Sequence, residues 1–228
     1  MTDVFAQKKY LVITGNYGSG KTEISLNLAL NASENKKTTI VDLDIVNPYF
    51  RTAEKSELLE HAGIRVLMPT FAMTTVDIPA LPPEIQSVFE TPSDHVIFDV
   101  GGDDTGAAAL GRYNPSFVKN KDNLITAFVI NCMRPLTMCS SDIVDLGMRI
   151  EKRSRMNIDM IINNTNLGSQ TTPEMIEKGE EIVLDCAEKM NIGFVYTTGE
   201  MDIVRKCRLQ TPIMPIKRYM IPEWMVEQ

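Results

Sequence analysis

One glycine-rich segment constrains the fold of this chain more than any other feature. It reads Gly15-Asn16-Tyr17-Gly18-Ser19-Gly20-Lys21-Thr22, and it joins an apolar run at 10–14 to a stretch with helical spacing. The pattern G-x-x-x-x-G-K-T between a strand and a helix is typical of a loop that binds phosphate groups. Glycines let backbone N–H groups turn inward around an anion, and the N-terminus of the following helix adds its dipole. A chance match is the alternative, and the flanking strand and helix disfavour it.

Each part of this loop has an expected role. We expect all eight residues to contact a nucleotide. The Lys21 ammonium is expected to reach the β/γ-phosphate oxygens and take part in catalysis, and the Thr22 hydroxyl to ligate Mg²⁺.

The rest of the chain alternates short β-branched runs with longer segments of helical period, which predicts an α/β fold. This succession indicates one P-loop NTPase domain over residues 1–228, with a mostly parallel sheet flanked by helices on both faces. The expected strands lie at 10–14, 38–42, 65–68, 95–100, 125–131, 159–163 and 193–197, and the expected helices at 21–34, 51–61, 140–156 and 172–190.

Acidic residues follow two of these strands, at the edge of a parallel sheet where ligands gather. Asp42 and Asp44 end the second strand, and Asp99 ends the fourth just before Gly101 and Gly102. We expect Asp42 and Asp99 to hold Mg²⁺, Asp44 to orient water toward the γ-phosphate, and the backbone of Gly102 to sense that phosphate. The alternative is that these acids and glycines form ordinary strand-end turns.

Taken together, the loop, Val41-Asp42-Leu43-Asp44 and Phe98-Asp99-Val100-Gly101-Gly102 resemble the MinD/ParA-like (CobQ/CobB/MinD/ParA) P-loop ATPases over most of the chain. The resemblance implies that Asp44 positions the attacking water, that Asp42 supports the metal shell and that Asp99 holds a Mg²⁺ water. Many members carry a Lys after the first loop glycine that reaches across a dimer, where this chain has Asn16. Either another cation such as Arg51 stabilises the developing charge, or hydrolysis is slow.

The segment Ile161-Ile162-Asn163-Asn164-Thr165-Asn166 resembles the place where family members contact the base. We therefore expect Asn163 and Asn164 to bind nucleotide, although loop capping is the ordinary role of such asparagines. Asn166 stands where guanine-specific proteins have an Asp, and an amide cannot accept both guanine N–H groups as a carboxylate does. ATP/ADP is thus the expected nucleotide.

Composition excludes some classes of partner. The formal charge of −7 and a pI near 5.0 disfavour DNA binding, and no segment predicts a membrane span, so we expect a soluble, cytoplasmic protein. Four Cys without metal-ligand spacing predict reduced thiols.

Two functions stay open: an ATPase switch acting on its own homodimer or on an unidentified partner, and a small-molecule kinase or ATP-dependent synthetase with an acceptor near 47–51 or Arg134.

Overall fold

The computed structural model describes residues 3–43, 55–68, 83–90, 92–102 and 104–220. Within these residues, eight strands form one sheet in the order β3-β2-β4-β1-β5-β6-β7-β8, and every neighbouring pair is parallel. The predicted α/β class with a parallel sheet is confirmed. The strands are β1 (Tyr10–Gly15), β2 (Thr38–Leu43), β3 (Arg65–Leu67), β4 (His95–Val100), β5 (Leu124–Ile130), β6 (Met160–Asn163), β7 (Phe194–Glu200) and β8 (Ile213–Ile216).

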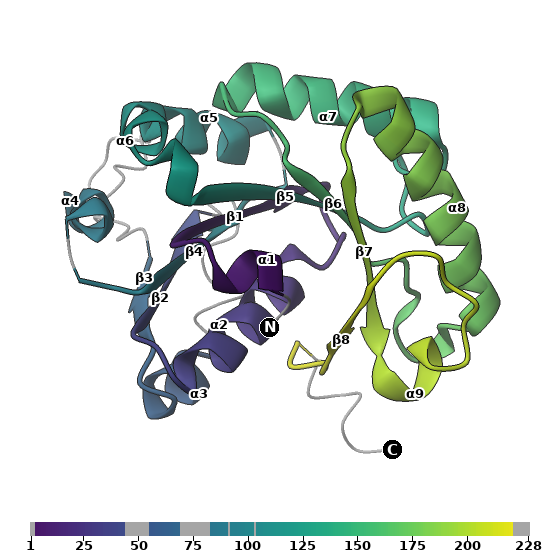
Figure 1. Cartoon of the computed structure of the whole chain (residues 1–228), viewed down its shortest axis with the longest axis horizontal. Coiled ribbons are helices and arrows are strands. Elements are labelled where there is room, and N and C mark those ends of the chain that lie inside the picture. The colour runs from purple at the N-terminus through teal and green to yellow at the C-terminus, as the bar shows by residue number, and fades with distance from the viewer. Residues whose placement is uncertain (1–2, 44–54, 69–82, 91, 103, 221–228) are drawn as a thin grey trace, which may run out of the picture.

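Helices cover both faces of this sheet (Figure 1). Alternate residues of β1 point to opposite sides, so that Leu11 and Ile13 pack on the face of α2, whereas Tyr10 and Val12 pack on the face of α5 and α6. The helices are α1 (Asp3–Ala6), α2 (Lys21–Ser33), α3 (Ser56–His61), α4 (Pro83–Gln86), α5 (Asp104–Arg112), α6 (Asn114–Lys119), α7 (Ser140–Ser154), α8 (Pro173–Met190) and α9 (Met201–Val204), with 3-10 turns η2 (Ser87–Phe89), η3 (Lys121–Asn123) and η4 (Gly168–Gln170).

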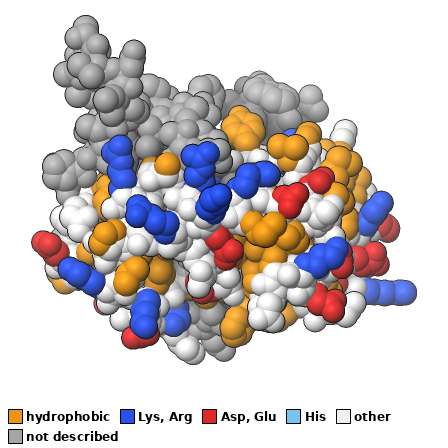
Figure 2. All heavy atoms as spheres, turned by 90° about the horizontal axis from the view of Figure 1, so that it is seen from above, with side chains coloured by type: hydrophobic (Ala, Val, Ile, Leu, Met, Phe, Trp, Pro, Cys, Tyr) orange, Lys and Arg blue, Asp and Glu red, His pale blue; other side chains and the backbone are white. Residues whose placement is uncertain are grey.

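Helix α7 illustrates how the sequence pattern becomes packing. Its buried positions include Ile143, Gly147 and Ile150, which face the sheet, while Asp142 and Arg149 are exposed. Figure 2 views the molecule from the side on which α7 lies and shows basic, acidic and hydrophobic side chains intermingled on that surface. In the part of the chain that the structure describes, no helix is long and apolar enough to cross a membrane.

Helices α5 and α6 were not predicted. The glycines and the Asn-Pro pair in this stretch favour a turn when only local sequence is considered. The structure explains the glycines by close approach, because a Cβ on Gly106 would lie 2.4 Å from the carbonyl oxygen of Gly101 and one on Gly111 would lie 3.0 Å from that of Arg153. The helix predicted at 51–61 begins at Ser56 in the described chain, and residues 51–54 lie outside it.

Candidate functional site

The glycine-rich loop connects β1 to α2, as the motif requires. Gly18 and Gly20 have φ of 71° and 89°, in the left-handed region that favours glycine. Close packing adds a second constraint, because a Cβ on Gly15 would lie 2.3 Å from the Val129 carbonyl oxygen and one on Gly20 would lie 2.2 Å from Nδ2 of Asn164. The loop is therefore pressed against the ends of β5 and β6, and its backbone path depends on these glycines.

Lys21 begins α2 and has a buried side chain. Its Nζ donates to the carbonyl oxygen of Asn16 over 2.8 Å, so the ammonium lies across the mouth of the loop. Gly102 approaches the same place from the end of β4: a Cβ there would lie 2.8 Å from Nζ of Lys21 and 2.6 Å from the backbone nitrogen of Tyr17. The strand-end glycine thus lies against the loop and its lysine.

Thr22, Asp42 and Asp99 come together behind the loop. The Thr22 hydroxyl donates to Oδ2 of Asp99 over 2.6 Å, and both side chains are buried. Asp42 is Asp99's partner in the parallel pairing of β2 with β4, and its side chain is buried as well. A hydroxyl and carboxylates are hard oxygen donors, and this donor set fits Mg²⁺.

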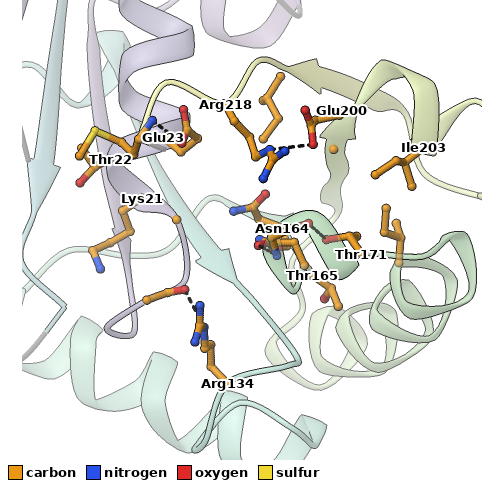
Figure 3. A pocket seen from close by; sticks show the side chains of 18 residues that line it. Lys21, Thr22, Glu23, Arg134, Asn164, Thr165, Thr171, Glu200, Ile203 and Arg218 are labelled. Carbon is orange, nitrogen blue, oxygen red and sulfur yellow. Dashed lines mark hydrogen bonds and ion pairs between the residues drawn. The ribbon is translucent and has the colours of Figure 1, made fainter. Parts of the chain in front are cut away.

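A cavity of about 250 Å³ extends from the loop toward β7 and β8 (Figure 3). Its polar end is formed by the loop and the start of α2, with Gly18, Gly20, Lys21 and Thr22. Its other end includes the aliphatic side chains of Ile176, Ile203 and Ile216. The phosphate-type loop at one end and the aliphatic side chains at the other are compatible with the two halves of a nucleotide, the phosphates and the base.

The two asparagines at the end of β6, Asn163 and Asn164, have different surroundings. Nδ2 of Asn164 donates to the Ser19 carbonyl oxygen over 2.8 Å, and its Oδ1 accepts from the Thr198 hydroxyl over 2.7 Å. Asn164 lines the cavity, whereas Asn163 is not among the described residues that do so. The Asn163 side chain is fully buried and donates to the Ile176 carbonyl oxygen, so it points into the protein.

Four loop residues, Gly15, Asn16, Tyr17 and Ser19, are not among the described residues that line this cavity. Gly15 and the strand-end Gly102 line a separate cavity of about 70 Å³, and Ser19 is buried. Asn16 donates from Nδ2 to the Pro135 carbonyl oxygen over 3.0 Å, and the Tyr17 side chain is exposed. Asp44 and Arg51 lie outside the described residues.

Sequence reasoning missed a group of charged side chains on the cavity rim. Arg218 Nε lies 2.8 Å from Oε2 of Glu200, and both residues line the cavity (Figure 3). Glu23 accepts from the backbone nitrogens of Tyr219 and Met220 over 2.6 and 3.1 Å. Burial raises the pKa of the Glu23 carboxyl, while these two N–H groups act in the opposite direction. Of these charged residues, only Glu23 has a sequence signal that places it near the site, because it directly follows Thr22.

Solved structures share this fold. A nucleotide-binding protein from Archaeoglobus fulgidus in complex with ADP superposes with a TM-score of 0.50 at 16% identity, over 84% of this chain and 81% of that one. The VpsO kinase domain gives 0.50 at 17% identity, over 70% of this chain and 85% of that one. Chloroplast FtsY from Physcomitrella patens gives 0.54 at 16% identity, over 82% of this chain and 58% of that one.

A scan against protein-family models and a search of curated proteins found no match. At these identities the structural likenesses describe the fold, and they agree with the resemblance inferred from the motifs. The chain therefore shares its α/β fold with the nucleotide-binding protein from Archaeoglobus fulgidus, the VpsO kinase domain and chloroplast FtsY.

Proposed function

We propose that this protein is a Mg²⁺-dependent ATPase whose ATP and ADP states differ in how they bind a partner. One observation carries the proposal: Lys21, Gly102 and the Thr22–Asp99 pair meet at the loop from which an apolar-ended cavity extends. The ADP bound to the Archaeoglobus fulgidus protein of the same fold supports a nucleotide as the ligand. The predicted single domain and cytoplasmic location remain part of this proposal.

In phosphoryl transfer the protein contributes mainly by positioning the reactants and by stabilising negative charge. Water adds to the γ-phosphorus while the bond to the bridging oxygen breaks, which gives ADP and inorganic phosphate. The loop N–H groups and the Lys21 ammonium would hold the phosphate oxygens, and Thr22, Asp42 and Asp99 would hold Mg²⁺, which neutralises phosphate charge when bound. Asp44 keeps its proposed role of orienting water on the strength of the sequence alone.

The proposed preference for adenine draws on the surroundings of Asn166, which lines the cavity. Its Nδ2 donates to the Asn164 carbonyl oxygen over 2.7 Å, and its Oδ1 accepts from the Gly168 nitrogen over 3.3 Å. The amide is therefore engaged with its own loop, and an amide lacks the paired acceptors that guanine N–H groups require. A larger rise in melting temperature with Mg-ATP than with Mg-GTP is expected, and equal shifts would refute the preference.

Nucleotide binding is tested directly by titration calorimetry on the wild type and two lysine variants. Lys21→Ala should lose measurable affinity for Mg-ATP, whereas Lys119→Ala, an exposed change on α6, should bind like the wild type. Asp44→Ala should retain binding and lose hydrolysis. A wild type that binds no nucleoside triphosphate in Mg²⁺ buffer would end the proposal.

The two functional hypotheses, a nucleotide switch and a small-molecule enzyme, lead to different expected results with the same purified protein. Size-exclusion chromatography in ATP and in ADP should show a nucleotide-dependent change of mass, either as a homodimer or with an added partner protein. Turnover stimulated by a metabolite, with a phosphorylated product, would instead favour a kinase or synthetase.

A further inference from the structure

The loop that follows β5 lies directly against the phosphate loop. Nε of Arg134 donates to the Gly18 carbonyl oxygen over 3.3 Å, and Nδ2 of Asn16 donates to the Pro135 carbonyl oxygen over 3.0 Å. Two contacts from opposite directions therefore join residues 134–135 to the loop. Figure 3 shows Arg134 below this loop, with its side chain pointing toward it.

A buried polar framework fixes the backbone from which Arg134 projects. The Thr137 hydroxyl donates to the carbonyl oxygen of Asn131 over 2.7 Å, and the Arg134 nitrogen donates to the same oxygen over 3.1 Å. Oδ1 of Asn131 accepts from the backbone nitrogens of Met133 and Asn166 over 3.0 and 3.2 Å. Asn131 and Thr137 are buried, so these bonds hold the backbone of the loop at its base, and the exposed Arg134 projects from that backbone.

The guanidinium of Arg134 retains donors for a ligand. Arg134 lines the cavity, and in the described chain no carboxylate lies within ion-pair distance of it. Among the same residues, none accepts a hydrogen bond from Nη1 or Nη2. A guanidinium has five N–H donors in a planar fork that matches two oxygens of a phosphate. Arg134 therefore presents positive charge and unused donors to the part of the cavity next to Gly18.

We propose that Arg134 binds the phosphate chain of the nucleotide and supplies its charge from within the same polypeptide. The inference rests on the proposed function and adds a ligand residue to it. Gly18 belongs to the loop that would wrap the phosphates. Because the Arg134 guanidinium is bonded to the Gly18 carbonyl oxygen, it lies next to the place proposed for the phosphate oxygens. Paired N–H···O contacts to phosphate are strong, and they neutralise charge on the nucleotide without a second protein copy.

The test compares the variants Arg134→Ala, Arg134→Lys and Arg65→Ala. Arg65 is the control position, because it is exposed and begins the edge strand β3. Calorimetry would measure the affinity of each variant for Mg-ATP, Mg-ADP and adenosine. Arg134→Ala should weaken ATP and ADP binding by about 10- to 100-fold and leave adenosine binding unchanged, because charged hydrogen bonds to phosphate are lost. Arg134→Lys should recover part of the loss, since it keeps the charge but not the fork. Arg65→Ala should match the wild type.

Two results would overturn the inference. One is ATP and ADP affinity in Arg134→Ala equal to that of the wild type. The other is an equal loss of adenosine binding, which would indicate a general distortion of the cavity. Failure of the proposed function is a separate outcome, since the wild type itself would then bind neither ATP nor ADP.

Discussion

The Thr22 hydroxyl and the Asp99 carboxylate are joined by a hydrogen bond of 2.6 Å between Oγ1 and Oδ2, although 77 positions separate them in the sequence. The bond links the first turn of α2 to the end of β4. Both side chains are buried, so the pair is shielded from water and its geometry is set by the packing of α2 on the sheet. This pair is the strongest structural reason for placing Mg²⁺ behind the loop.

Replacing Thr22 with Val should remove this link while keeping the shape of the side chain. We expect the Mg²⁺ concentration that gives half-maximal ATPase activity to rise by about 10- to 100-fold, because an oxygen that ligates or orients the metal is lost. The unfolding free energy should fall by about 1–3 kcal/mol, since a buried carboxylate loses its donor. Thr22→Ser retains the hydroxyl and is the matched control. An unchanged Mg²⁺ requirement in Thr22→Val would contradict the assignment.

Gly102 gives a second prediction, because there is no room for a side chain beside it. A methyl group at this position would meet the Tyr17 nitrogen at 2.6 Å and Nζ of Lys21 at 2.8 Å, so the loop or the lysine must shift. Displacement of about 1 Å in a catalytic site lowers turnover by about 100-fold, and we expect Gly102→Ala to show a loss of this size in steady-state ATPase assays. In Gly193→Ala the new methyl group meets no atom within 4 Å, and its activity should equal that of the wild type.

Local pattern was enough to predict much of the fold and part of the site. The motif and its flanking period located β1, the loop and α2. The acid in each apolar strand placed Asp42 and Asp99 on neighbouring strands, and their role at a metal stays a prediction. Contacts between distant segments were not predictable. The Glu200–Arg218 ion pair and the backbone contacts of Glu23 depend on how the chain after β8 returns over α2. No short-range signal encodes that path, since it follows from packing of the whole sheet.

Of the two asparagines at the end of β6, Asn164 lines the cavity and Asn163 is buried behind it. Asn164→Ala removes the bond to the Ser19 carbonyl oxygen, and Asn163→Ala removes buried bonds to Ile176 and Thr197. Each variant should lose about 2–4 kcal/mol of unfolding free energy in urea titrations, because buried polar groups lose partners. The affinity for Mg-ATP should fall by about tenfold only in Asn164→Ala, where a contact of the phosphate loop is lost. A reversed order of the two affinities would show that Asn163 is the nucleotide-binding residue.

The cysteines yield a prediction about chemical reactivity that is independent of nucleotide. Burial raises the pKa of Cys186 to about 12, and the neighbouring Asp185 carboxylate acts in the same direction. Burial also raises the pKa of Cys132, whereas Cys139 is exposed before α7. Since the thiolate is the reactive form, iodoacetamide at about pH 8 should modify Cys139 and spare Cys132 and Cys186 in the folded protein.

Peptide mass spectrometry of the labelled protein would measure each site, and the same reaction in denaturant should modify all four cysteines. The sign of the pH effect follows from the raised pKa. Between about pH 7 and pH 9, Cys186 stays protonated in the native state, so its labelling should remain slow and limited by unfolding. Rapid native labelling of Cys186 in that interval would mean that the α7–α8 layer opens without global unfolding, because Cys186 belongs to the cluster that packs this layer on β5 and β6.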